Sequence, residues 1–244
     1  EGWNLGTYTP NETAVGVYDG DVYNYVGPAE KALLTELYNL RVSKKEISKM
    51  SKPIKRIISI NDLSTFGKCS QTVAVPVLSA MGIEVCPVIT AYLSAHTAFD
   101  NPVITDMTES LDKCLSHLNT LKVESDCIFT GYVYTLPQFE FIKKYVMAKK
   151  AEGNFIFTDP VMADNGELYY PFDENTVKKM RELCLFSDVI TPNFTEACLL
   201  AGLPVPESIN EAQADYLIVR LNSLGINCKI IITGVPFYDG TKKI

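Results

Sequence analysis

Acidic side chains follow two of the apolar runs in this sequence, and the second of them, Asp159, could bind a cation. Asp62 lies in "SINDLSTFG", after the run at 54–60, and Asp159 lies in "TDPVMADNG", after the run at 154–158. Carboxylate oxygens hold Mg²⁺ directly or through waters, together with phosphate oxygens. An Asp that precedes a proline also commonly starts a turn, so Asp159 has a purely local alternative role.

The stretch "ITPNFTEACLL" supplies a third acid. Pro192 ends an apolar run, Asn193 stands at an N-cap position, and Glu196 follows three residues later. This spacing predicts a capping box, in which the two side chains satisfy each other's backbone N–H groups. The capping role alone would explain both residues. Their place after a strand also predicts that Glu196 projects from a helix N-terminus toward the same sheet edge as Asp159.

Several common catalytic motifs are missing from the 244 residues. There is no G-x-x-x-x-G-K-[ST] loop and no G-x-G-x-x-G fingerprint. H-E-x-x-H and G-x-S-x-G are absent as well. His117 lies between apolar positions of a predicted helix and is interpreted as a surface residue. His96, in "LSAHTAF" after an apolar run, is the better candidate for holding a ligand or a loop.

The elements that must position these side chains alternate regularly along the chain. Six β-branched apolar runs occupy residues 54–60, 83–90, 126–130, 154–158, 187–191 and 228–233. Stretches of helical period separate them, at 105–121, 137–152 and 209–224 among others. This alternation predicts an α/β fold with three layers, in which helices cover both faces of a mostly parallel central sheet. Ligands of such sheets bind beyond the carboxyl ends of the strands, where the polar segments of this sequence lie.

Composition and charge restrict the class of protein. Charged residues make up 21% of the chain and the net charge is −7 without long like-charged runs, so no nucleic-acid footprint is present. The sequence contains no 18-residue apolar run, which a membrane-spanning helix would need, and no signal-peptide pattern. We therefore expect a cytoplasmic protein. The seven cysteines lie mostly in apolar runs and are interpreted as small core residues in a reducing compartment.

Residues 1–49 do not share the alternation. "TAVGVYDGDVYNYV" resembles a hairpin, and the following "GPAEKALLTELYNLRVSKKEISK" resembles an amphipathic helix. Met50 begins a segment that leads directly into the first strand. We therefore predict an N-terminal extension of unclear role at 1–49 and one α/β domain at 50–244.

Taken together, the polar loops resemble those of the ribokinase-like superfamily and, within it, the pyridoxal/pyridoxine/pyridoxamine (vitamin B6) kinases. The resemblance extends from about Lys55 to Ile244. It rests on the order and spacing of "SINDLSTFGKCS", "LSAHTAF", "FTGYV", "DPVMADNGELYYP", "ITPNFTEACLL" and "IITG". It implies a homodimeric kinase that uses ATP, Mg²⁺ and a monovalent cation (K⁺ or Na⁺), with a small vitamin as its partner and neither nucleic acid nor membrane.

The resemblance also implies roles for individual residues. Those that match the vitamin-binding positions are Ser59, Asp62, His96, Thr97, Gly131 and Tyr132. Those that match ATP-binding positions are Asp164, Tyr169, Thr191, Asn193 and Thr233, of which Thr191 and Thr233 correspond to hydroxyls near the monovalent cation. Those that match the positions organising Mg²⁺ are Asp159, Asn193 and Glu196.

One departure from the family concerns the catalytic base. The family places this base, an Asp, in a G-[TA]-G-D loop at the start of a helix, and no G-x-G-D occurs in the 244 residues. No catalytic residue is therefore assigned. The sequence ends after the sixth apolar run, which favours a truncated or rearranged chain, and we expect severely reduced turnover from this polypeptide.

Three functions remain open at this stage. The first is ATP-dependent phosphorylation of the 5′-hydroxymethyl group of a B6 vitamer. The second is a hydroxymethylpyrimidine kinase of thiamin metabolism, which "SINDLSTFG" disfavours because the first loop of those kinases is richer in glycine. The third is a non-catalytic relative that binds B6 or a nucleotide.

Overall fold

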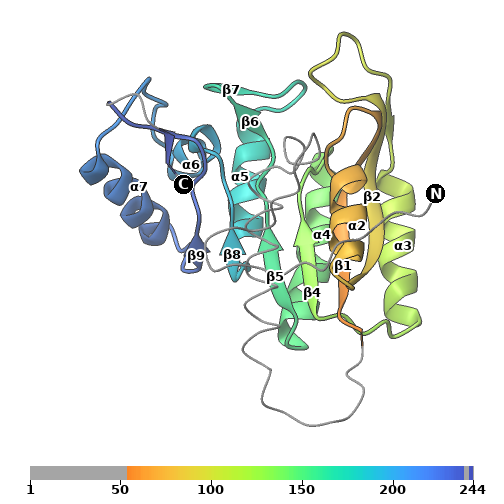
Figure 1. The fold of residues 1–244 in the computed structure, drawn as a ribbon. Coiled ribbons are helices and arrows are strands. Elements are labelled where there is room, and N and C mark those ends of the chain that lie inside the picture. The colour runs from red at the N-terminus through yellow and green to blue at the C-terminus, as the bar shows by residue number, and fades with distance from the viewer. Residues whose placement is uncertain (1–53, 239–241, 244) are drawn as a thin grey trace, which may run out of the picture.

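The computed structural model describes residues 54–238 together with Lys242 and Lys243, and these residues form a sheet covered by helices (Figure 1). The order of the main sheet is β3-β2-β1-β4-β5-β8-β9. Its strands are β1 (Arg56–Phe66), β2 (Glu84–Ala95), β3 (Ile104–Asp106), β4 (Cys127–Thr130), β5 (Phe155–Thr158), β8 (Val189–Ile190) and β9 (Lys229–Ile230). All neighbours are parallel except β2 and β3. The predicted fold class is therefore confirmed, whereas the extension at 1–49 lies outside the described residues.

Six helices are described. They are α2 (Gln71–Ala80), α3 (Thr108–Thr120), α4 (Leu136–Ala151), α5 (Glu174–Cys184), α6 (Phe194–Ala201) and α7 (Glu211–Ser223). The predicted helices at 105–121, 137–152 and 209–224 correspond to α3, α4 and α7. Helix α3 begins later than expected because residues 104–106 form β3, and the Asp106 carboxylate instead accepts the backbone N–H of Thr108 at 2.8 Å.

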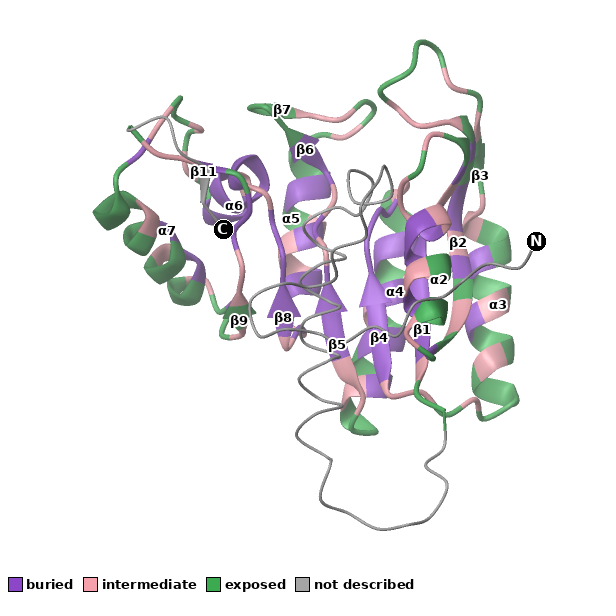
Figure 2. Cartoon of the chain, viewed as in Figure 1, coloured by how far each residue is buried: buried purple, intermediate pink, exposed green. Residues whose placement is uncertain are grey.

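The alternation of side chains along β1 builds a core on each face of the sheet. Ile57 packs with α2 residues such as Leu78, whereas Ile58 and Ile60 pack with the cluster that contains residues of α3 to α7. Successive side chains of a strand point to opposite faces, so this two-sided burial requires an almost continuous apolar run. Figure 2 shows the buried residues concentrated in the strands and in the inner sides of the helices.

Strand β1 lies inside the sheet, with β2 on one side and β4 on the other. The chain winds outward in one direction through β2 and in the other through β4, β5 and β8. The connections at the carboxyl ends of β1 and β4 therefore lead away from each other, and a crevice opens at such a switch point.

Smaller elements lie at the carboxyl edge. β2 and β3 form an antiparallel pair that the sequence did not predict, with Leu93 opposite Ile104. Two further hairpins are β6 (Ala163–Asp164) with β7 (Glu167–Leu168), and β10 (Val235–Pro236) with β11 (Lys242–Lys243). None of the described helices combines the length and the apolar character needed to cross a membrane.

Candidate functional site

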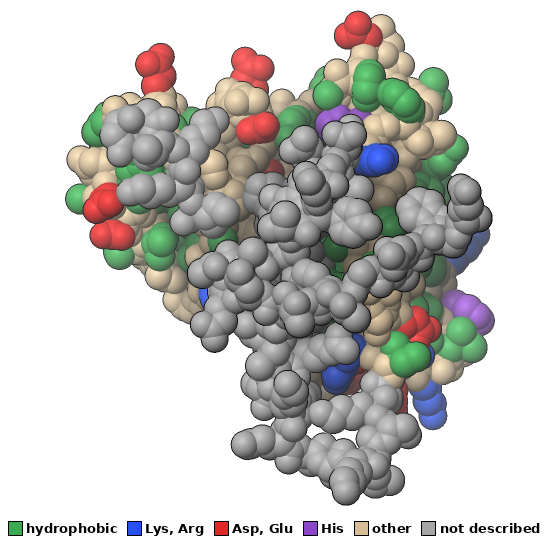
Figure 3. Space-filling model, in the orientation of Figure 1, with side chains coloured by type: hydrophobic (Ala, Val, Ile, Leu, Met, Phe, Trp, Pro, Cys, Tyr) green, Lys and Arg blue, Asp and Glu red, His purple; other side chains and the backbone are tan. Residues whose placement is uncertain are grey.

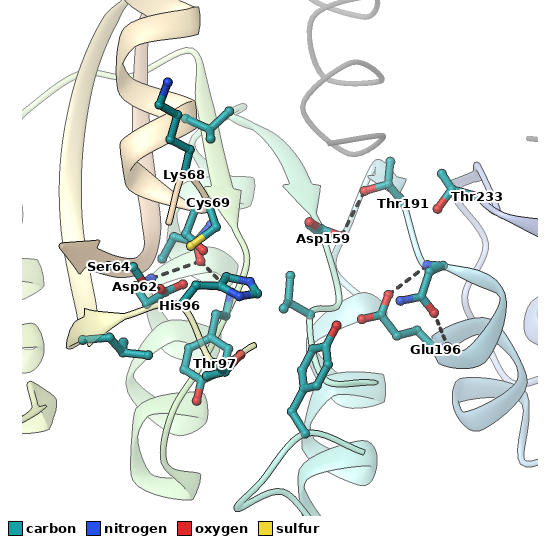
Figure 4. Close-up of a pocket in the computed structure, with 18 residues that line it drawn as sticks. Asp62, Ser64, Lys68, Cys69, His96, Thr97, Asp159, Thr191, Glu196 and Thr233 are labelled. Atoms are coloured by element: carbon teal, nitrogen blue, oxygen red, sulfur yellow. Dashed lines mark hydrogen bonds between the residues drawn. The ribbon is translucent and has the colours of Figure 1, made fainter. Parts of the chain in front are cut away.

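A cavity of about 370 Å³ lies at the carboxyl edge of the sheet, between two walls (Figure 4). The first wall comes from β1, the loop after it, α2, β2 with its following loop, and the segment after β4: Asn61, Asp62, Ser64, Lys68, Cys69, Ser70, Val73, Leu93, His96, Thr97 and Tyr132. The second wall comes from the segments after β5, β7, β8 and β9 and from α6: Asp159, Val161, Tyr169, Thr191, Asn193, Glu196 and Thr233. The cavity thus brings together most of the residues that the sequence singled out.

Asp62 is the buried acid of the first wall. Its side chain lies at the cavity although the residue is only 5% exposed, and its carboxylate accepts a hydrogen bond from the Ser64 hydroxyl at 3.2 Å. Burial raises the pKa of Asp62, while hydrogen bonds from Ser70 and Ser64 and the charge of His96 act to lower it. The free-energy cost of desolvating this carboxylate is therefore offset by hydrogen bonds from the surrounding hydroxyls, and a polar ligand would offset it further.

His96 is fixed to the end of β1 through its backbone and to its own loop through its ring. Its N–H donates to the carbonyl of Phe66 at 2.8 Å, and its Nδ1 accepts the N–H of Ala98 at 3.0 Å. Because Nδ1 is an acceptor, the neutral ring carries its proton on Nε2 and has a donor to offer. Gly67 makes this approach possible, since a Cβ there would lie 2.7 Å from the Cβ of His96.

Two of the predicted vitamin-binding residues do not line the cavity. Ser59 is fully buried and shares the sheet face of Ile57, toward α2, where Gln71 Nε2 donates to its carbonyl at 2.7 Å. Direct contact between Ser59 and a ligand is therefore not supported by the geometry. Gly131 lies behind the wall, against the Asn61 side chain. Thr97 and Tyr132 do line the cavity, as predicted.

Glu196 closes the second wall through the predicted capping box, which is confirmed. Asn193 Oδ1 accepts the Glu196 N–H at 2.9 Å, and Glu196 Oε2 accepts the Asn193 N–H at 2.8 Å. Its other oxygen accepts the N–H groups of Met162 at 3.0 Å and Ala163 at 3.4 Å. Burial raises the pKa of Glu196 to about 8, although these backbone N–H groups lower it; the charge of Asp164 raises it further.

The other predicted phosphate-side residues lie around the same helix start. The hydroxyl of Thr191 donates to Asp159 Oδ1 at 3.4 Å, and Thr233 pairs in a β-bridge with Asn193. Tyr169 contributes a phenol whose pKa is raised by burial and by the nearby acids, so it remains protonated and can donate.

The predicted ATP-binding residue Asp164 does not line the first cavity. It lines a second cavity of about 610 Å³, to which Asn193 and Thr233 also belong. Its carboxylate accepts the backbone N–H of Asn165 at 2.8 Å in the β6–β7 turn. Asn193 and Thr233 line both cavities, so the two spaces share a border at the start of α6.

Acidic charge dominates this edge of the molecule. Figure 3 shows acidic side chains projecting along the edge where the strands end. Within the described part of the chain, no group of three or more His, Cys, Asp or Glu side chains is arranged to hold a metal ion by itself. A cation here would need ligand oxygens or waters in addition to Asp159, which is how Mg²⁺ is usually held beside phosphate.

Sequence reasoning missed several residues of the first wall. Cys69 was interpreted as a core residue, but it is only half-buried and lines the cavity, as does Lys68. Both follow β1, so the rule that ligands bind beyond strand ends would have selected them. By contrast, His117 is exposed in the last turn of α3, as predicted.

Replacing Asp62 by asparagine should stabilise the fold at neutral pH. The raised pKa means that the native state binds more protons than the unfolded chain between the two pKa values, so wild-type stability falls as the pH rises through this range. The asparagine side chain cannot ionise, and this fall should be lost. Urea unfolding from pH 3 to 7 measures it, with Asp100→Asn, at an exposed position, as the control. Identical pH slopes for both variants would contradict the assignment.

Known proteins resemble this chain in sequence. A family model described as phosphomethylpyrimidine kinase matches residues 75–243. The pyridoxal kinase of Dictyostelium discoideum is 29% identical over 194 residues, which make up 75% of this chain and 61% of that protein. The chain thus spans less than two thirds of this relative's length.

Two solved structures resemble the fold as well. A protein from Bacteroides thetaiotaomicron that is described as a phosphomethylpyrimidine kinase, in a crystal form with pyridoxal, is 36% identical with a TM-score of 0.72, over 76% of this chain and 65% of that one. The pyridoxal kinase of Leishmania donovani, in complex with ADP and pyridoxamine, is 26% identical with a TM-score of 0.63, over 70% and 60%. These likenesses confirm the resemblance to vitamin B6 kinases. Since the family match also covers more than half of the sequence, the chain belongs to the phosphomethylpyrimidine kinase family, within the ribokinase-like superfamily.

Proposed function

We propose that this chain binds a B6 vitamer and ATP side by side and serves the ATP-dependent phosphorylation of the vitamer's 5′-hydroxymethyl group. The observation that carries the proposal is the cavity with two unlike walls: Asp62, His96 and Tyr132 face Asp159 and the α6 N-terminus across one space. The names of two of the relatives support it, since both are pyridoxal kinases and one of them is in complex with ADP and pyridoxamine.

The first wall would bind the vitamin. A B6 vitamer is an aromatic ring that carries hydroxyl groups, so it needs donors, an acceptor and an apolar surface. The Asp62 carboxylate accepts, His96 Nε2 donates, and the ring of Tyr132 and the side chains of Val73 and Leu93 supply apolar contact. The phosphate acceptor would therefore lie on this side, with its hydroxymethyl group toward the second wall.

The second wall would bind the phosphates of ATP. The first N–H groups of a helix attract anions, and α6 begins at this wall. Asp159 and Glu196 would hold Mg²⁺ together with phosphate oxygens and waters, and Thr191 and Thr233 would border a monovalent cation. When bound, Mg²⁺ neutralises phosphate charge, and phosphoryl transfer then depends mainly on positioning and electrostatics. The second cavity, with Asp164, would extend the nucleotide site.

The proposal includes a homodimeric, cytoplasmic enzyme, as the family resemblance implies. A hydroxymethylpyrimidine kinase is the second candidate, and the description of the matching family favours it. The substrates of both kinases are ring-bearing alcohols, so the second wall would bind the phosphates of ATP in either case. A non-catalytic binding protein is the candidate of another class, because no G-x-G-D base occurs in the sequence.

A ligand screen by thermal unfolding separates these candidates. Pyridoxal or pyridoxine at 100 times its Kd should stabilise the chain by about 2.7 kcal/mol, which corresponds to a Tm increase of about 5–10 °C. Hydroxymethylpyrimidine should have a smaller effect, and Mg·ATP should stabilise independently. Stabilisation by the pyrimidine alone would overturn the B6 assignment. A coupled ADP-release assay then distinguishes a kinase from a protein that only binds.

A further inference from the structure

The side chain of Asn61 lies where β1 and β4 part. The two strands pair up to Ile60 and Thr130, and the Gly131 N–H still donates to the Ile60 carbonyl at 3.0 Å. Beyond this point the Asn61 side chain takes the place of the backbone: its Oδ1 accepts the Tyr132 N–H at 2.8 Å and the Asp62 N–H at 3.0 Å. Asn61 is 2% exposed and lines the cavity.

These two contacts fix the orientation of the amide. A carboxamide has one accepting atom and one donating atom, and here both backbone donors meet the same atom. That atom must be the oxygen, so the NH₂ group is necessarily on the other side. The opposite orientation would face two N–H groups with an NH₂ group and would lose both hydrogen bonds.

The Nδ2 group is left with donor capacity at the cavity. None of the residues that the structure describes accepts a hydrogen bond from it, and it is not among the fully enclosed polar atoms that lack a partner. It therefore retains access to the cavity that Asn61 lines. Gly131 holds it there from behind, since a Cβ at Gly131 would lie 2.4 Å from Nδ2. The group is a rigid donor beside the Asp62 carboxylate, whose oxygens accept.

We infer that Asn61 is a specificity-determining residue: its Nδ2 donates to an acceptor on the ring of the bound alcohol, either the ring nitrogen or a ring-bound oxygen. This inference rests on the proposed function. Rotation of the amide would break its hydrogen bonds to the N–H groups of Asp62 and Tyr132, so the donor keeps its orientation. A ligand without an acceptor at this place therefore leaves the donor unpaired. Sites that hydrogen-bond a substrate strongly reject analogues that lack the partner group.

Asn61→Asp removes the donor and keeps an oxygen for the two backbone N–H groups. It also adds a carboxylate beside Asp62, and the ligand analogues described below separate that effect from the loss of the NH₂ group. Calorimetric titration should show the Kd of pyridoxine raised about 10- to 30-fold. Asn154→Asp is the matched control: Asn154 Oδ1 accepts the Ser125 hydroxyl at the opposite end of the sheet, and the Kd of this variant should change less than twofold. Asn61→Ala is titrated in parallel, because it also removes the donor and replaces the aspartate variant if that one does not fold.

Two analogues of pyridoxine identify the acceptor. One has C–H in place of the ring nitrogen, and the other lacks the 3-hydroxyl group. The native chain should bind one of them about 10- to 30-fold more weakly than pyridoxine, and Asn61→Asp should weaken that analogue no further. Equal weakening of pyridoxine and both analogues would overturn the inference, since the added charge alone would then explain the effect. So would native affinity in Asn61→Asp.

Failure of the proposed function is recognised separately. If the native chain binds hydroxymethylpyrimidine and no B6 vitamer, the B6 assignment falls, and the same titrations with that pyrimidine and its analogues lacking either ring nitrogen test Asn61. If the native chain binds neither alcohol, both the proposed function and the role of Asn61 are overturned.

Discussion

A chain in which alanine replaces Glu196 should unfold with a free energy about 3–4 kcal/mol lower than the native chain. The Glu196 carboxylate accepts the backbone N–H groups of Met162, Ala163 and Asn193, and the residue is only 3% exposed. Alanine leaves all three donors without an acceptor, and each unpaired buried donor costs about 1–3 kcal/mol, less where cavity water reaches it. Chemical denaturation monitored by circular dichroism measures the loss.

The control for this prediction is a second capping box in the same chain. Gln213 occupies the corresponding place in α7, in an exposed position. Its Oε1 accepts one backbone N–H, that of Asn210 at 3.0 Å, and the Tyr238 hydroxyl at 3.2 Å. Gln213→Ala should therefore cost about 1 kcal/mol or less. Glu196→Gln keeps one accepting oxygen and should lie between the two. A loss in Glu196→Ala no larger than in Gln213→Ala would show that the three donors find other partners.

Gly131→Ala should cost about 2–4 kcal/mol of unfolding free energy and most of the ligand affinity. The added Cβ would lie 2.4 Å from Nδ2, 2.7 Å from Cγ and 2.8 Å from Oδ1 of Asn61. Overpacking typically costs about 1–3 kcal/mol. Here Asn61 cannot turn aside without breaking its hydrogen bonds to the N–H groups of Asp62 and Tyr132, so the cost should exceed the usual one. Urea unfolding and ligand titration of the same variant measure both losses.

A double-mutant cycle separates this collision from other effects of the new methyl group. In Asn61→Ala the colliding amide is absent, so Gly131→Ala should cost little more in that background. The two changes should therefore be strongly non-additive, by about 1–3 kcal/mol. Gly131 is not among the glycines with a positive φ, so the new methyl group adds no backbone strain of that kind. Additive losses at Asn61 and Gly131 would contradict the steric account.

Some of this architecture could be predicted because it depends on local sequence. The capping box of Asn193 and Glu196 needs only residues three apart, and the helices α3, α4 and α7 follow from spacing within one segment. The resemblance to a kinase family then ordered the polar loops correctly, so that most of the predicted residues share one cavity. The positions of these residues after the strands predicted their proximity, because the carboxyl ends of parallel strands lie at one edge of the sheet.

The remaining features depend on contacts between distant segments. The pairing of Asn61 with Gly131 and Tyr132 joins residues about 70 positions apart, and no local pattern marks it. The position of Ser59 away from the cavity has a simpler origin: it shares the sheet face of Ile57, which the alternation of β1 already implied. The β2–β3 pair was missed because β3 has three residues, and such a short strand has no measurable period.

The division of the cavity into two walls has a consequence for how such proteins diverge. All residues of the first wall except Tyr132 come from the continuous stretch 61–97, whereas the second wall is drawn from residues 159–233. Under the proposed function, mutations confined to that stretch would change which alcohol binds, while the second wall kept its geometry. A new substrate could then be acquired by replacing one short continuous segment, provided that Gly131 and Tyr132 changed with it.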